Sequence, residues 1–351
     1  MHPLLILIRQ QLSCLLFSAV RLRSSGLTKL KPMRCLLLCL TLSIAWPVVA
    51  QDYPEKGRPI KIVVPSGPGS ALDLLARAYA KAIGETQGLT AYVENKPGAD
   101  GTVGIQSFLA SPADGYTLLL GSSSWTVLNP IMMAKLPYDS QKDLLPLATI
   151  SKTGMVMSIG GAAPFKTLRE FVKAARAEPG KYTCASASPS LRMACEYLQA
   201  SAGIKLLVVP YKTTAAAMLA VASGEADAVF ADASSSLTFW QTGRLKGVAF
   251  ATPERTPAFP QIPMTREEGL PDFLMGVWYG FYFKAGTPPA VAASMREFLH
   301  KAAARAVVKD ALKTFAHEPL NLTPAQMADL TRKETERWSK LVRDHGIKFN
   351  N

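Results

Sequence analysis

The feature that most constrains the fold is a regular alternation of strand-like and helical stretches between residues 60 and 251. Short runs of aliphatic and β-branched residues, such as Ile60–Val64, are each followed by a loop and then by a stretch with helical spacing. Neighbouring parallel strands need a long crossover connection, which is usually a helix. The sequence therefore predicts an α/β protein with parallel-rich sheets flanked by helices.

The expected elements are spread along the chain after residue 58. The expected strands cover residues 60–64, 90–93, 116–120, 155–159, 181–185, 206–210, 228–231, 246–251 and 278–283. The expected helices cover residues 71–83, 102–110, 167–177, 190–202, 214–223, 289–314 and 324–346. A chain of about 300 residues with this composition is long enough to form two domains with ordinary cores.

The N-terminal residues indicate export. Residues 33–50 join a basic start, an apolar run over 35–49 and a small-residue end at Ala50, so we expect a secretory signal that is cleaved after Ala50. A membrane anchor is the alternative, but the apolar run is short for a span and is interrupted by Pro47. A second apolar stretch, over 4–20, makes Met33 the expected true start. We expect a periplasmic protein and a monomer.

Charge and cysteine content narrow the possible ligands. The full chain has a net charge of +13, and loss of residues 1–50 removes six Lys/Arg and no Asp/Glu, which leaves +7. The remaining basic residues form no block with interleaved aromatics, which argues against a nucleic-acid partner and suits a small anion. Cys184 and Cys195 remain after cleavage. An oxidising compartment would permit a disulfide between them, and two buried free thiols remain the alternative.

The first candidate site follows the strand at 60–64, where a Gly/Pro/Ser loop leads into a helix. The backbone amides of a helical first turn and the positive end of its dipole make such a junction an anion site. Ser70 and Asp73 also have the spacing of a capping box, so a capped helix without a ligand is the plain alternative. The ligand-binding candidates in this loop are Ser66, Gly67, Gly69, Ser70, Ala71 and Asp73.

Four further loops follow expected strands, and ligands of α/β proteins bind at the carboxyl ends of parallel strands. After the strand at 116–120 come Ser122, Ser123, Ser124 and Trp125, whose alternative is a polar loop with an inward-packed tryptophan. From the end of the strand at 181–185 into the first turn of the helix at 190–202 come Ser186, Ser188, Ser190 and Arg192. The arginine either binds a second carboxylate, forms an interdomain salt bridge or is a solvated helix residue. Tyr211 and Asp232 follow two other strands, and Asp232 is alternatively a helix cap.

The sequence contains few of the residue patterns that are typical of enzymes. The histidines beyond residue 50 are His300, His317 and His345, and none lies near a Cys or carboxylate cluster with metal-ligand spacing. No Gly-x-Ser-x-Gly nucleophile motif is present, and Leu72 replaces the third glycine of a dinucleotide-binding fingerprint. We therefore expect no catalytic residues, no metal and no cofactor.

Seven short motifs in one order give the chain a family resemblance over nearly all of its length after the leader. These motifs are Arg58–Pro65, Val93–Ala99, Asp114–Leu119, Asn129–Pro130, Leu136–Asp139, Val209–Lys212 and Ala285–Pro288. In this pattern the chain resembles the Bug family, the periplasmic solute receptors of tripartite tricarboxylate transporters. The resemblance implies a type II-like, two-domain periplasmic binding protein of the Venus-flytrap kind. Such a protein closes an interdomain cleft over a small organic carboxylate and delivers it to a two-component membrane permease.

The same resemblance frames the domain boundaries and the alternatives. It implies one domain from 51–153 and 273–351 and a second from 154–272, with Asp232 at a position where the family carries a polar or acidic residue near the ligand. Ser70, Leu72 and Arg192 depart from the usual family residues, so the sequence does not name the acid. Two other functions stay open: a receptor that signals through a membrane sensor kinase, and a periplasmic scaffold without a ligand.

Overall fold

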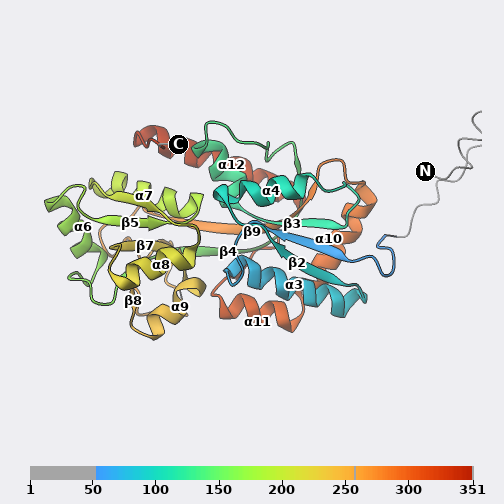
Figure 1. Cartoon of the computed structure of the whole chain (residues 1–351), viewed down its shortest axis with the longest axis horizontal. Helices are drawn as coiled ribbons and strands as arrows, with labels where there is room; N and C mark the ends of the chain where they lie inside the picture. The colour runs from blue at the N-terminus through green and yellow to red at the C-terminus, as the bar shows by residue number, and fades with distance from the viewer. Residues whose placement is uncertain (1–52, 257, 350–351) are drawn as a thin grey trace, which may run out of the picture. The chain divides into compact units, whose positions relative to one another are not determined.

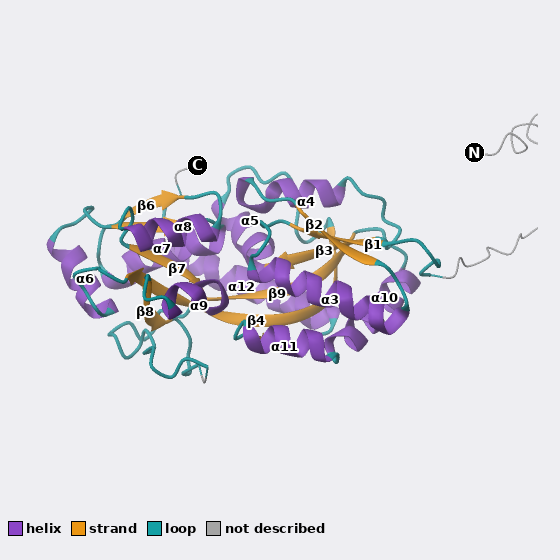
Figure 2. Ribbon diagram, turned by 60° about the horizontal axis from the view of Figure 1, so that its bottom comes forward, coloured by secondary structure: helices purple, strands orange, loops and turns teal. Residues whose placement is uncertain are grey.

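A mixed β-sheet with helices on both faces forms the framework of the chain (Figures 1 and 2). The computed structural model describes residues 53–256 and 258–349. The expected cleavage after Ala50 and the expected start at Met33 lie outside the described residues and stay predictions.

The strands and helices are as follows. The strands are β1 (Ile60–Val64), β2 (Ala91–Asn95), β3 (Thr117–Ser122), β4 (Leu144–Gly160), β5 (Thr183–Ser186), β6 (Leu207–Pro210), β7 (Ala228–Asp232), β8 (Leu245–Phe250), β9 (Gly276–Lys284) and β10 (Glu318–Pro319). The helices are α3 (Ala71–Gln87), α4 (Thr102–Leu109), α5 (Asn129–Met132), α6 (Leu168–Ala177), α7 (Pro189–Ala202), α8 (Thr214–Ser223), α9 (Ala233–Gln241), α10 (Pro289–Ala303), α11 (Ala306–Thr314) and α12 (Pro324–Asp344). Two short turns are η1 (Ala99–Gly101) and η2 (Ser124–Leu128).

The sheet joins two parallel groups through two long antiparallel strands. Its order is β2-β1-β3-β9-β4-β7-β5-β6, with β8 and β10 also paired to β4. Strand β1 is parallel to β2 and β3, and β5 is parallel to β6 and β7. Strands β4 and β9 run antiparallel to their neighbours. The predicted α/β fold is confirmed, and its two parallel groups are joined through β9 and β4.

Helices cover both faces of the sheet. Helix α3 packs with α10 and α11, and Tyr79 of α3 meets Phe281 of β9 with ring centroids 5.1 Å apart. Helix α12 contacts η2 and β4, and α7 and α8 lie on opposite faces of β5 and β7 (Figure 1). Because β9 lies between two strands and beneath helices on both faces, residues 277–283 are all buried. This burial explains why the segment reads as an unbroken apolar run.

The main differences from the sequence prediction have local causes. Strand β4 begins at Leu144 and not near Met155, because irregular pairing with β9 around Pro146 and Thr149 disturbs the alternation that would mark a strand. The single helix expected over 289–314 is two helices that meet at Ala304 and Arg305, where neither Gly nor Pro signals a break. Helix α9 was not predicted, because serines favour turns and caps over helix interiors.

Candidate functional site

The junction between β1 and α3 is built around the buried carboxylate of Asp73. Ser70 caps α3, its Oγ accepting from the Asp73 amide at 3.2 Å. The carboxylate accepts from the Gly69 amide at 2.9 Å, from Asn95 Nδ2 at 3.0 Å and from Arg77 at 3.0 and 3.1 Å. Burial raises the pKa of Asp73, but the hydrogen bonds from Arg77, Gly69 and Asn95 outweigh burial and hold this pKa below its ordinary value. Asp73 therefore orders the loop and has few positions left for a ligand.

The loop itself is turned back on the helix. Gly69 has φ +77°, which favours glycine, and this conformation aims its amide at Asp73. The Ser70 amide donates to the Gly67 carbonyl at 3.3 Å, and Ser66 and Ser70 share a hydrogen bond of 2.8 Å. The two amides expected to hold a carboxylate, those of Gly69 and Ser70, are thus occupied in this structure. The Ala71 amide, in the first helical turn, is by position one of the donors without a partner in the helix.

The serine loop after β3, defined as Ser122–Ser124, is buried. The Ser122 hydroxyl accepts from the Ser124 amide at 3.1 Å, and the Ser123 hydroxyl accepts from the Trp278 amide at 3.2 Å. Trp125 is 6% exposed and packs over Gly101, where a Cβ would lie 2.3 Å from the indole nitrogen. The Trp125 side chain therefore packs inward against the loop at 99–101. This position corresponds to the alternative of an inward-packed tryptophan.

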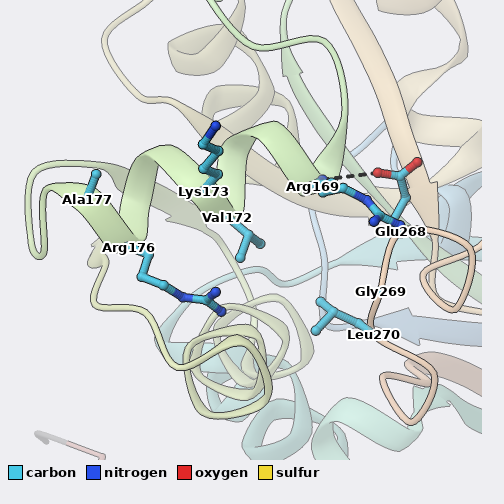
Figure 3. A pocket seen from close by; sticks show the side chains of 8 residues that line it. All are labelled: Arg169, Val172, Lys173, Arg176, Ala177, Glu268, Gly269 and Leu270. Atoms are coloured by element: carbon cyan, nitrogen blue, oxygen red, sulfur yellow. Dashed lines mark hydrogen bonds between the residues drawn. The ribbon is translucent and has the colours of Figure 1, made fainter.

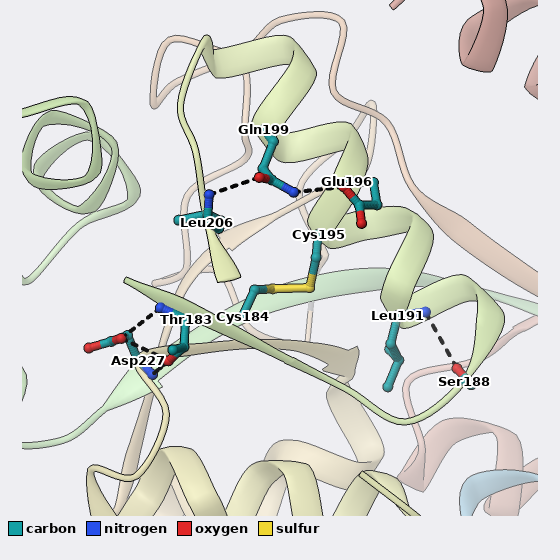
Figure 4. The surroundings of a disulfide bond; sticks show 9 residues. All are labelled: Thr183, Cys184, Ser188, Leu191, Cys195, Glu196, Gln199, Leu206 and Asp227. Atoms are coloured by element: carbon teal, nitrogen blue, oxygen red, sulfur yellow. Dashed lines mark hydrogen bonds between the residues drawn. A yellow bond between two sulfur atoms is a disulfide. The ribbon is translucent and has the colours of Figure 1, made fainter. Parts of the chain in front are cut away.

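The junction between β5 and α7 is held by a cap and a covalent bond. The Ser188 Oγ accepts from the Leu191 amide at 3.4 Å, and Pro189 occupies the first helical position, where its missing N–H costs nothing. Cys184 at the centre of β5 and Cys195 on α7 form a disulfide, with Cα atoms 6.0 Å apart (Figure 4). All candidate residues of this junction lie between the two cysteines in sequence. The bond therefore closes a short loop around the segment that leads into the helix.

Hydroxyl groups connect the serine loop to the α7 junction. The Ser124 hydroxyl donates to Ser190 Oγ at 2.7 Å, and Ser190 also shares a hydrogen bond of 3.2 Å with Ser188. Ser122 donates to Ser124 at 3.2 Å, so four hydroxyls form one chain. A Cβ placed on Gly67 would lie 3.8 Å from the Thr213 methyl group, which brings the first loop against the loop after β6. Strand ends from both parallel groups thus meet at one place.

Arg192 faces the loop before α4. Its charge lowers the pKa of Asp100 in part, although burial raises that pKa above the ordinary value overall. It also lies over the ring of Phe349 at 5.6 Å. These contacts correspond to the electrostatic alternative for Arg192, with a carboxylate of the chain in the place of a ligand carboxylate.

Two more candidates have partners within the chain. The Tyr211 hydroxyl donates to Glu225 Oε1 at 2.9 Å. Asp232 caps α9, accepting from the Ser235 amide at 2.8 Å, from the Ser235 hydroxyl at 3.1 Å and from the Ser234 hydroxyl. For Asp232 these contacts are those of a helix cap, the alternative considered from the sequence. Ser186 is buried, and its carbonyl accepts from the Tyr211 amide at 2.7 Å.

Three surface cavities lie away from these loops. One of about 470 Å³ lies between α6 and the turn at Glu268–Leu270, flanked by Arg169 and Arg176 (Figure 3). Two others, of about 620 and 510 Å³, lie beside α3 and α11 and on α10. The Arg169 side chain donates to the Glu267 carbonyl at 3.1 Å and its amide to Glu268 at 3.0 Å. None of these three cavities is lined by a residue of the strand-end loops.

Residues 53–256 and 258–349 contain no group of three or more His, Cys, Asp or Glu side chains placed to hold a metal ion. Over the same residues, no helix has the length and apolar character needed to cross a bilayer.

The chain matches the model of the tripartite tricarboxylate transporter family receptor over residues 75–347. It belongs to this receptor family. The receptor is 31% identical to the "UPF0065 protein in tcbD-tcbE intergenic region" of Pseudomonas sp. (strain P51), covering 84% of this chain and 88% of that protein. It is 29% identical to protein BugT of Bordetella pertussis, covering 88% and 95%. The family resemblance drawn from the seven motifs is confirmed.

Solved structures give the receptor the fold of periplasmic binding proteins. A periplasmic transporter protein superposes with a TM-score of 0.80 at 29% identity, covering 85% of this chain and all of that one. MatC from Rhodopseudomonas palustris with bound malate superposes with a TM-score of 0.76 at 26% identity, covering 82% and all of that chain. The family comprises periplasmic solute-binding receptors and not enzymes.

The structure also places near the candidate loops several residues that sequence reasoning did not single out. Thr213 approaches Gly67, Asp100 faces Arg192, Tyr279 pairs with Ser122 of the serine loop, and His317 stacks on Tyr279. Thr213 had a signal, since it follows an expected strand and precedes a helix. His317 had none, because it lies far along the chain between expected helices.

Proposed function

We propose that this receptor captures a small organic acid at the strand-end loops and delivers it to a two-component membrane permease. The observation that carries the proposal is the hydroxyl chain from Ser122 to Ser188, which joins loops of both parallel groups at one place. Hydroxyl groups can donate to a carboxylate, and the first turn of α3 adds backbone amides and a positive dipole end. The likeness to MatC with bound malate supports an acid as the ligand.

Closure of two domains is part of the proposal. We assign residues 51–153 and 273–351 to one domain and 154–272 to the other, with the boundaries at the middle of β4 and just before β9. Only β4 and the segment leading into β9 would then join the two domains, which suits a hinge. A ligand between the serine loop and the α7 junction would favour the closed form and present a changed outer surface to the membrane partner.

Ligand binding is tested by thermal unfolding of the purified protein, refolded to remove bound ligand, against a panel of mono-, di- and tricarboxylates. A ligand present at a hundredfold excess over its Kd adds about 2.7 kcal/mol of stability, which shifts Tm by several degrees. Ser70→Glu should abolish that shift, because its carboxylate repels the acid at the helix terminus. Ser294→Glu, on the outer helix α10, is the matched control and should retain the full shift.

Delivery is tested in cells. A strain without the gene should lose uptake of the acid that stabilises the protein, and the gene supplied in trans should restore uptake. Unchanged uptake together with a lost transcriptional response to the acid would favour the sensor-kinase alternative. No stabilisation by any acid would contradict the receptor proposal for this ligand class.

A further inference from the structure

A polar row crosses the sheet next to the serine loop. Tyr279 of β9 pairs with Ser122 of β3 on one side and with Ser151 of β4 on the other. Directly opposite residues of paired strands project from the same face of a sheet. Ser122, Tyr279 and Ser151 therefore form one row on one face of the sheet. The row starts at the serine loop on β3 and crosses β9 to reach β4.

His317 lies on this row. Its Nδ1 is 3.1 Å from Ser151 Oγ, and its ring stacks on that of Tyr279, with centroids 5.3 Å apart and planes inclined by 9°. The side chain is buried, with 5% of the residue exposed. Phe315 contacts the same ring edge-on at 6.5 Å. The imidazole is thus fixed in orientation by aromatic contacts and by one hydrogen bond.

One polar atom of this cluster, His317 Nε2, is buried and has no hydrogen-bond partner within the described part of the chain. The Tyr279 ring stacked on the imidazole carries a second polar group, its hydroxyl. Leaving a buried polar group unsatisfied costs about 1–3 kcal/mol, so native proteins usually supply such groups with a partner, in the chain, in water or in a ligand. The unpartnered imidazole nitrogen of His317, beside the hydroxyl-bearing ring of Tyr279, forms a site for a hydrogen-bonding group.

The negative charge of Asp232 restricts which ligand groups can bind beside Tyr279 and His317. Burial raises the pKa of Tyr279 well above its ordinary value, and the negative charge of Asp232 raises it further. Burial lowers the pKa of His317, and Asp232 opposes this only in part. Tyrosine and histidine are therefore neutral near pH 7, beside a negative charge. A second carboxylate would be repelled here, whereas a hydroxyl or an ammonium group would be accepted.

We propose that Tyr279 and His317 bind the hydroxyl or amino substituent of the ligand, while its carboxylate lies at the serine loop and the α3 junction. This inference rests on the proposed function and narrows its ligand class to short hydroxy acids or amino acids. Tyr279 and His317 determine specificity within that class. Ser122 links the two ends of the ligand site, because it belongs both to the hydroxyl chain and to the polar row.

The test compares acids that differ only in the substituent. Succinate, malate and aspartate carry hydrogen, hydroxyl and ammonium on the same four-carbon chain, and glutarate, 2-hydroxyglutarate and glutamate repeat the series with five carbons. We expect isothermal titration calorimetry to show at least about tenfold tighter binding of a substituted acid than of its unsubstituted partner, the value of one satisfied buried hydrogen bond.

Two variants localise the effect. Tyr279→Phe and His317→Phe keep the stacked rings and remove the polar atoms, so each should reduce the preference for the substituted acid to a few-fold while changing binding of the unsubstituted acid less than about twofold. Tyr53→Phe is the matched control, since its hydroxyl donates to Gly115 at the start of β3, at the end of the strand opposite the serine loop. Circular dichroism and Tm establish that each variant folds.

Each outcome has a distinct meaning. Equal binding of substituted and unsubstituted acids by the wild-type protein would overturn this inference and leave the receptor proposal standing. The assignment to these residues would be overturned if Tyr279→Phe and His317→Phe both kept the preference for the substituted acid. It would also be overturned if the two variants bound every acid equally more weakly. Failure of all six acids to bind would count against the inference and the proposed function together.

Discussion

The two strand-to-helix junctions at the candidate site hold the same kind of structure with different bonds. Helix α3 and helix α7 both begin after a serine cap, Ser70 and Ser188. The α3 junction is a glycine-containing turn fixed by the buried carboxylate of Asp73, whereas the α7 junction has proline in its first turn and a disulfide across its loop. One junction therefore depends on ionisation and the other on oxidation.

This difference indicates how each loop resists loosening. The α3 junction gains its order from three hydrogen-bond donors that all reach one carboxylate, so removal of that carboxylate releases the whole turn. The α7 junction spreads its restraint over a covalent bond, a proline and the hydroxyl contact to Ser124. We expect it to tolerate the loss of any one of these better than α3 tolerates the loss of Asp73.

The largest expected effect is that of Asp73→Ala. The variant leaves the Gly69 amide without its acceptor and Asn95 Nδ2 with only the Ser66 carbonyl, and it should lower the free energy of unfolding by about 2–4 kcal/mol. Urea unfolding measures the change. Glu85→Ala on the same helix removes only exposed ion pairs with Lys81 and Arg305 and should cost less than about 1 kcal/mol. If the two variants lost equal stability, Asp73 would not be the centre of the α3 junction.

Breaking the disulfide should cost nearly as much. A cross-link over a loop of this length stabilises a protein by about 2–3 kcal/mol, mainly through the unfolded chain. Urea unfolding with and without a reductant measures this value. The double variant Cys184→Ala/Cys195→Ala should have the same free energy of unfolding in both conditions. A wild-type protein as stable reduced as oxidised would mean that the hydroxyl contacts and Pro189 alone hold the α7 junction.

A smaller effect is expected for the contact that joins the two regions. Ser190→Ala removes a buried partner of Ser124 and should cost about 1–2 kcal/mol. A double-mutant cycle with Ser124→Ala should give a coupling energy of at least about 0.5 kcal/mol. Strict additivity of the two single variants would show that the serine loop and the α7 junction are energetically independent.

The smallest expected effect is a difference between the two junctions in how their contribution to stability depends on pH. The folded-state pKa of Asp73 lies below the ordinary value of 3.8, so its contribution is fully present above pH 3.8 and is lost as the pH falls below that value. Stability measured between pH 5 and 3 should therefore fall less steeply in Asp73→Asn than in the wild-type protein. The reduced protein should show the same dependence of stability on pH as the oxidised wild-type protein. A changed pH dependence after reduction would contradict the view that ionisation acts at the α3 junction and oxidation at the α7 junction.

The sequence predicted the places of these loops better than their contacts. Ser70 was expected as a cap because its spacing to Asp73 is local, and the Arg77 partner lies one turn further along the same helix. Asn95, which completes the network, comes from a different strand and has no local signal. The order of strands and helices was readable for the same reason: periodicity is a property of neighbouring residues.

The polar row was beyond prediction for a different reason. The segment 277–283 is apolar on both faces, so its sequence shows a strand but not the face on which Tyr279 lies. The hydrogen bond between Ser124 and Ser190 joins residues 66 positions apart, and only the sheet order brings them together. Each loop could be named as a candidate, whereas the pairing of loops required the three-dimensional fold.

The place of β9 in the sheet also bears on how the chain is made. Strand β9 lies between β3 and β4, but it is the last long strand to be synthesised. Until residue 284 has left the ribosome, the edges of β3 and of the first part of β4 have no partner, and such edges invite pairing with other chains. The group formed by β5, β6 and β7 has all its strands by residue 232. We therefore expect the growing chain to need protection from aggregation mainly around β3 and the first part of β4, which have to wait for β9.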